Sequence, residues 1–190
     1  MRKALAITGI VFAALLTIVL VLGIIFWFAF GGGTYFTRTP APTITYGEFP
    51  FRLTYEVDGE IKVVEDTVIC EFDGFKVVGE SGKYRQWKER LKSGNVEITL
   101  LDIRESGEIN EIGQTMLELY FFYGTAAYYM GDMDNPYARD AQTFEWVDYI
   151  YQNAEGKIGY SGYKADEAYE KYKIRLISWD ASPPIENTFK

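Results

Sequence analysis

The sequence contains no histidine and a single cysteine, Cys70, among its 190 residues. Without histidine the chain cannot form a Ser–His or Cys–His nucleophile pair, and it lacks the most frequent ligand of catalytic zinc. One cysteine permits neither an internal disulfide nor a cysteine cluster around a metal. Cys70 lies in an apolar run, which predicts a buried, unreactive thiol, with a disulfide between neighbouring copies as the alternative.

Charge is absent from one long stretch of the chain. Residues 4–30 contain no charged side chain and directly follow Met1-Arg2-Lys3. The hydrocarbon core of a bilayer is crossed by about 20 apolar residues in a helix, so this segment is predicted to be an uncleaved transmembrane helix in contact with the lipid bilayer. A signal peptide usually has an apolar region of only about 7–15 residues. A cleaved signal peptide and a buried helix are the alternatives.

The residues that flank this segment indicate its orientation. Arg2 and Lys3 precede it, and Arg38 is the basic residue that follows within a dozen positions. The positive-inside rule therefore predicts a single-pass protein of the cell membrane, with residues 1–3 as a short cytoplasmic start and the carboxyl domain outside. A lateral homodimer is a further hypothesis, because small residues that allow close helix packing repeat every four positions, at Gly9, Ala13 and Thr17.

The rest of the chain is acidic. Residues 31–190 carry all 27 acidic residues and 17 of the 19 basic ones, which is a formal charge of −10. Nucleic acids repel such a domain, so no nucleic-acid partner is expected. Glycines at 31–33 and prolines at 40 and 42 predict a tether over residues 31–46. Residues 47–190 are then long enough for one folded extracytoplasmic domain.

The folded domain is predicted to open with a β-hairpin. Residues from Phe51 to Val57 alternate between apolar and polar side chains, Asp58-Gly59 is a favoured two-residue turn, and Ile61–Phe72 returns as the second strand. A change of phase predicts a β-bulge at Val63-Val64. Asp73-Gly74 marks the expected next turn.

Two short helices and several further strands complete the expected fold. Apolar residues at helical spacing predict helices over Gly82–Ser93 and from Ala165 to Tyr172; the remaining face of the first is basic, which indicates either a solvated surface or a site for an anionic partner. Strands are predicted at Val96–Leu100, Thr115–Tyr123, Ala126–Met130, Phe144–Tyr151 and Ile174–Trp179. The expected fold is an N-terminal transmembrane helix followed by a small α+β domain that is mainly antiparallel β.

Two short motifs are similar to those of the serine penicillin-recognising enzymes. Ser161-Gly162-Tyr163-Lys164 matches S-x-x-K, and Lys92-Ser93-Gly94 approximates K-T-G. The two motifs occur in the reverse order, the domain is too small, and S-D-N is represented only by Ser93-Gly94-Asn95. This activity is therefore not predicted.

Acidic residues offer two further hypotheses. An irregular calcium loop is one, at Asp132, Asp134, Asn135 and Asp140; an EF-hand is excluded because Pro136 and Tyr137 occupy its fifth and sixth positions. The other is a glycosidase acid–base pair, formed by Glu108 with Glu111 or by Asp132 with Asp134. Neither pattern is specific, so the sequence assigns no catalytic residue, no cofactor and no metal-binding residue.

Aromatic content is the most suggestive positive feature. The fifteen tyrosines are concentrated in Tyr120–Tyr129 and Tyr149–Tyr172, where they form either the core or a surface for proteins or sugars. In layout, with a basic start, an uncleaved anchor, a tether and a cysteine-poor outer domain, the chain resembles single-pass envelope proteins of Gram-positive bacteria. The expected function is a non-enzymatic binding module at the bacterial cell envelope, for a protein or envelope polymer. A small carboxylate-dependent hydrolase of cell-wall glycan is the alternative.

Overall fold

A computed structural model of the chain describes residues 2–29, 39–78, 82–141 and 144–190. Helix α1 spans Arg2–Ala29, and its side chains from Phe12 to Trp27 are exposed. None of the helices in these ranges combines the length and hydropathy of a membrane span. Two compact units are distinguished, of which the larger, residues 41–74 and 86–190, contains nearly all of the β structure.

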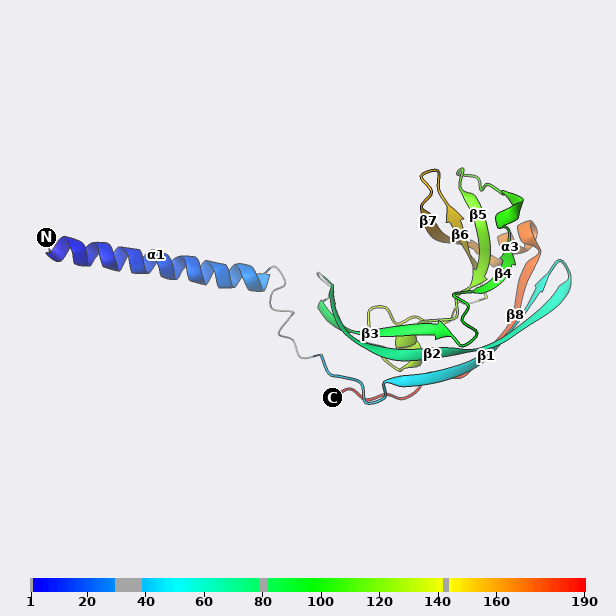
Figure 1. The fold of residues 1–190 in the computed structure, drawn as a ribbon, viewed down its shortest axis with the longest axis horizontal. Coiled ribbons are helices and arrows are strands. Elements are labelled where there is room, and N and C mark those ends of the chain that lie inside the picture. The colour runs from blue at the N-terminus through cyan, green and yellow to red at the C-terminus, as the bar shows by residue number, and fades with distance from the viewer. Residues whose placement is uncertain (1, 30–38, 79–81, 142–143) are drawn as a thin grey trace. The chain divides into compact units, whose positions relative to one another are not determined.

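The first of two four-stranded sheets has the order β3-β2-β1-β8 (Figure 1). Its strands are β1 (Tyr46–Val57), β2 (Glu60–Val78), β3 (Gly82–Leu91) and β8 (Ile174–Ala181). Every second residue of β1, from Phe49 to Val57, is buried, because successive side chains of a strand point to opposite faces. The alternation in the sequence therefore located the core-facing side of this sheet correctly.

The predicted hairpin is confirmed, but two of its details are wrong. β1 pairs with β2 around the turn Asp58-Gly59, and both turn residues have the positive φ, 52° and 83°, that a type I′ turn requires. The β1–β2 register runs without a shift through Val63-Val64; the irregularity lies between Thr54 and Tyr55, against β8. β2 also continues past Asp73-Gly74, where Gly74 takes a φ of 89° within the strand.

The helix predicted over Gly82–Ser93 is wrong, because this segment is strand β3. Its basic side chains pair with acidic side chains of β2 across the sheet: Lys88 lies 2.8 Å from Asp73, and Arg90 lies 3.3 Å from Glu71. Opposite charges on neighbouring strands stabilise a sheet. The predicted basic helix face therefore does not exist, and Lys88 and Arg90 are paired with acidic residues of the same sheet.

The second sheet has the order β4-β5-β6-β7 with antiparallel pairing throughout. Its strands are β4 (Ile98–Asp102), β5 (Thr115–Phe121), β6 (Trp146–Gln152) and β7 (Ile158–Lys164), with the 3-10 helix η3 (Arg104–Ser106) after β4. β5 and β6 occupy the interior positions, as their apolar sequences predict. The edge strand β7 was not predicted.

Residues 126–130 were predicted to be a strand, but they begin with the short helix α2 (Ala126–Tyr129). The backbone N–H of Ala126 donates to Glu89 Oε2 of β3 at 3.0 Å, which satisfies one of the amides left unpaired at a helix start. Tyr129 is fully buried, and its ring packs at a tilt of 34° against Phe49 of β1, with ring centroids 4.9 Å apart. Tertiary contacts therefore decide the conformation of this segment.

One hydrophobic core lies between the two sheets. Trp179 of β8 connects them, because its ring centroid lies 4.8 Å from that of Phe51 in the first sheet and 4.8 Å from that of Phe121 in the second. Cys70 lies in this core, as predicted, and burial raises its pKa to about 12. The thiol is therefore protonated and inert at neutral pH.

Helix α3 (Ala165–Tyr172) is confirmed where the sequence predicted it. Glu167 accepts a hydrogen bond from the backbone N–H of Lys164 at 3.2 Å, so the carboxylate stabilises the helix start. The helix ends at Lys173, whose φ is 55°. α3 contacts β6 and β7 of the second sheet and β8 of the first. The helix therefore packs against the second sheet, beside the pocket described below.

The carboxyl-terminal segment pairs with the first residues of the larger unit. The Ala41 and Lys190 backbones exchange two hydrogen bonds of 2.9 Å, and Thr43 N–H donates to Thr188 O at 2.8 Å. Residues 41–46, which the sequence assigns to the tether, are thus held against the domain. The rest of the predicted tether up to residue 38 lies outside the described residues.

Candidate functional site

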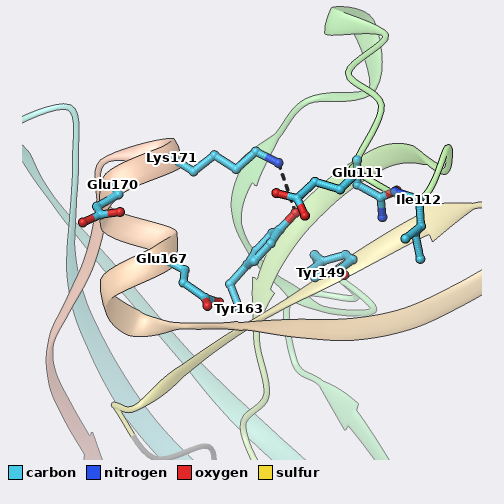
Figure 2. Close-up of a pocket in the computed structure, with 8 residues that line it drawn as sticks. Glu111, Ile112, Tyr149, Tyr163, Glu167, Glu170 and Lys171 are labelled. Atoms are coloured by element: carbon cyan, nitrogen blue, oxygen red, sulfur yellow. Dashed lines mark hydrogen bonds between the residues drawn. The ribbon is translucent and has the colours of Figure 1, made fainter.

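The candidate site is a pocket between α3, strands β6 and β7, and the loop that precedes β5. Its volume is about 530 Å³, and Figure 2 shows the side chains that line it. Asn110, Glu111 and Ile112 come from the loop, Tyr149 from β6, Tyr163 from β7, and Glu167, Glu170 and Lys171 from α3. The loop before β5 and the consecutive elements β6, β7 and α3 therefore build one site.

Two tyrosine rings line the pocket, and a third packs against one of them. Tyr149 and Tyr163 stack with ring centroids 4.5 Å apart and an interplanar angle of 28°, and Tyr172 of α3 lies 5.7 Å from Tyr163. The β6–β7 register produces the stack, because Tyr149 pairs with Ser161, two residues before Tyr163 on the same face. Offset stacking of this kind is favourable beyond simple burial. The rings are therefore fixed by the sheet.

An ion pair lies beside these rings. Lys171 Nζ is 3.2 Å from Glu108 Oε1 and donates to the Tyr163 hydroxyl at 3.2 Å, while the Tyr172 hydroxyl donates to Glu108 Oε1 at 2.8 Å. Burial raises the pKa of Tyr172, and its hydrogen bond to Glu108 raises it further. Burial alone would lower the pKa of Lys171, but Tyr163 and Glu108 outweigh it and raise that pKa. Both groups therefore keep their protons at neutral pH.

The pocket lining carries more negative than positive charge. Glu111, Glu167 and Glu170 line it, whereas Lys171 is its basic residue and is already paired with Glu108. In Figure 2 the Glu111 side chain points towards the Tyr163 hydroxyl and the end of Lys171, while the Glu170 carboxylate points away from the rings. The electrostatic field of the pocket therefore favours cations.

The structure places the two hypothesised carboxylate pairs in different surroundings. Glu111 lines the pocket, and Glu108 lies beside it, where it is bound by the lining residue Lys171 and by Tyr172. Asp132 is fully buried, and its Oδ2 accepts from Trp87 Nε1 at 2.8 Å, whereas Asp134 is exposed. Among the described residues, no group of three or more acidic, histidine or cysteine side chains is arranged to hold a metal ion.

The S-x-x-K match is a coincidence of sequence. Ser161 and Lys164 lie three residues apart on β7, and an odd separation on a strand places two side chains on opposite faces. Lys164 is also the residue that precedes α3. Of the four residues in the match, the one that lines the pocket is Tyr163, which the motif leaves unspecified.

Sequence reasoning identified the tyrosine-rich segment 149–172 but not the site within it. The pairing that brings Tyr163 onto Tyr149 requires β7, whose Gly159 and Gly162 weaken the strand signal. Both glycines have a packing reason: a Cβ at Gly159 would lie 2.4 Å from the Tyr151 ring, and one at Gly162 would lie 2.8 Å from Asp148 Oδ1. The sequence feature that could have indicated β7 is the spacing of Gly156, Gly159 and Gly162 at every third position beside Tyr160 and Tyr163.

The outer face of the second sheet carries a separate group of acidic and aromatic side chains. Asp148 lies over Gly162, Tyr120 meets Tyr160 edge to face at 6.4 Å, and Glu97 lies close enough to raise the pKa of Tyr120. Burial raises the pKa of Asp148, and burial followed by the neighbouring Glu118 raises that of Glu97. Asp148 and Glu97 therefore bind a proton more tightly than exposed carboxyl groups do.

Comparison with known proteins adds no assignment: no family model, curated protein or solved structure matches this chain.

Proposed function

We propose that this chain is a single-pass membrane protein whose outer domain binds a protein or envelope polymer without catalysing a reaction. The pocket of Tyr149, Tyr163 and Lys171 is its recognition site. The observation that carries the proposal is the preformed pocket itself, because a sheet register and a helix hold its rings in place before any ligand arrives.

The proposed anchor is the uncharged segment 4–30. Its support is the sequence, which has no charge over this length, together with the exposure of α1, whose large apolar side chains between Phe12 and Trp27 are 49–69% exposed. A contiguous apolar surface of this kind is stable in lipid or against protein, and costly in water. Arg2 and Lys3 support an inward-facing amino terminus.

Binding is favoured over catalysis by the state of Glu108. Its carboxylate is engaged by Lys171 and by the Tyr172 hydroxyl, so it serves to hold the pocket together. A glycosidase acid needs a carboxyl group that keeps a proton and faces the substrate. The Glu108 oxygen Oε1 is instead occupied by partners from its own chain.

Photo-crosslinking in intact cells tests the recognition site. A photo-crosslinking residue in place of Ile112, which lines the pocket and is 76% exposed, should trap a discrete partner. The same residue in place of Met133, exposed on a distant turn, is the matched control and should not trap it. No discrete adduct at Ile112, or identical adducts at both positions, would contradict the proposal. Release of soluble fragments from purified cell-wall glycan would support the hydrolase hypothesis instead.

A carboxyl-terminal epitope tag tests the orientation. The tag should be accessible to antibody on intact cells, since the domain is proposed to lie outside. Labelling that appears only after the cells are permeabilised would place the domain inside and refute the proposed topology.

A further inference from the structure

The pocket already holds an ammonium group that belongs to the chain. Lys171 Nζ meets a carboxylate of Glu108 and a hydroxyl of Tyr163, each at 3.2 Å, and lies 5.2 Å from the ring centroids of both Tyr163 and Tyr172. A carboxylate, a hydroxyl and aromatic faces are the groups that recognise an alkylammonium ion. The fold therefore assembles an ammonium site and fills it with an internal side chain.

Further negative charge lines the same pocket. Within the residues that the structure describes, Glu111 and Glu167 form no ion pair with a basic side chain, although Glu167 accepts the backbone N–H of Lys164. An anionic ligand would be repelled by these carboxylates, and a cation would be attracted. Charge complementarity therefore selects a positively charged occupant.

A neutral sugar fits the rings less well. Sugars need an open aromatic face, but Tyr149 is 8% exposed and one of its faces is covered by Tyr163. Ile112 and the tyrosine edges instead offer apolar contact for an alkyl chain. A lysine side chain combines such a chain with a compact ammonium group.

We propose that this pocket recognises the ammonium group and aliphatic stem of a lysine side chain presented by a partner protein. The inference rests on the proposed binding function and names the chemistry of its ligand. Lys171 acts as an intramolecular competitor that holds the pocket until a partner lysine arrives at Glu111 and the Tyr163 ring.

NMR titration of the full chain in non-ionic detergent micelles tests the inference, with trilysine and its Nε-acetylated form as probes. Trilysine should shift the Tyr149 and Tyr163 signals, and the acetylated peptide, which has the same stem without the side-chain charge, should not. Lys171→Met removes the competing ammonium and should tighten trilysine binding roughly fivefold. Glu111→Gln and Glu167→Gln should each weaken it, and together roughly fivefold, with glutamine retained at 167 as a capping side chain.

Glu186→Gln is the matched control, because it removes the same charge from the carboxyl-terminal segment outside the pocket. Equal weakening by Glu186→Gln and Glu111→Gln would show general attraction to an acidic domain and overturn the inference. Equal binding of acetylated trilysine, or weaker binding to Lys171→Met, would overturn it as well.

These outcomes are separable from the fate of the proposed function. If trilysine fails to bind while the Ile112 crosslink persists, the pocket is a recognition site and the lysine assignment is wrong. If trilysine binds but Ile112 traps no partner in cells, the ammonium chemistry stands and the proposed function fails.

Discussion

Replacing Asp132 by alanine removes a fully buried carboxylate from the turn after α2. Its Oδ2 accepts hydrogen bonds from Trp87 Nε1 at 2.8 Å and from Asn135 Nδ2 at 3.1 Å, and Asn135 is itself only 7% exposed. Removal of the acceptor leaves two donors without their partner, and a buried donor left without an acceptor costs about 1–3 kcal/mol. We therefore expect Asp132→Ala to lower the free energy of unfolding by about 3–5 kcal/mol.

Urea unfolding of the full chain in non-ionic detergent, followed by near-ultraviolet circular dichroism, measures this loss. Asp134→Ala is the matched control, because Asp134 lies exposed in the same turn and should change stability by at most about 0.5 kcal/mol. Trp87→Phe keeps a ring and removes one donor. Combined with Asp132→Ala in a double-mutant cycle, it should give a coupling energy of about 1–3 kcal/mol.

A loss below about 1 kcal/mol for Asp132→Ala would refute the reasoning, because it would mean that the buried donors find other acceptors at little cost. The same variant addresses the calcium hypothesis. Asp132 is committed to Trp87 and Asn135, so millimolar calcium should leave the unfolding transition of the unmodified chain unchanged. A calcium-dependent increase in stability that is lost in Asp132→Ala would show that Asp132 is a metal ligand.

Three further predictions follow from burial. Cys70, with a pKa raised to about 12 by burial, should resist maleimide at pH 7 in the folded chain and react rapidly in urea; equal rates would contradict its burial. Gly131→Ala should destabilise the domain by more than about 2 kcal/mol, because the added Cβ would lie 2.3 Å from the Ile185 carbonyl oxygen. Gly59→Ala should cost about 1 kcal/mol, because a Cβ there has no atom within 4 Å. Equal losses in urea unfolding would refute the clash at Gly131. Asp148→Asn should stabilise the domain at pH 7, because burial raises the pKa of this carboxyl in the folded state and stability therefore falls as pH rises above about 4. The advantage of asparagine in melting curves should vanish below that pH. A difference that does not depend on pH would exclude this cause.

The segment of β3 shows why one element could not be predicted. Arg85, Trp87, Glu89 and Leu91 lie at alternate positions on one face of β3, so two charged residues interrupt the apolar–polar alternation that identifies a strand. Arg85 Nη1 donates to the Pro40 carbonyl at 3.3 Å, and Glu89 accepts from the Ala126 backbone at 3.0 Å. Arg85 and Glu89 are thus satisfied by partners that are distant in the sequence. No local pattern predicts these partners.

Local chemistry determined what the sequence alone could predict. The alternation over Phe51–Val57 and the Asp58-Gly59 turn specified the hairpin, and the helical spacing of apolar residues from Ala165 to Tyr172 specified α3. These signals act between residues a few positions apart, so they survive without the rest of the fold. The uncharged segment 4–30 is likewise a local signal, and the proposed anchor rests on it.

The tertiary structure decided the pocket. Tyr149 and Tyr163 stack only because β6 and β7 pair in one register, and Lys171 reaches Glu108 only because α3 packs on those strands. Each contact joins residues that are separated in the sequence by a strand, a turn or a whole connection. Composition predicted tyrosines suited to binding; the sheet register and the position of α3 made them a site with a charge preference.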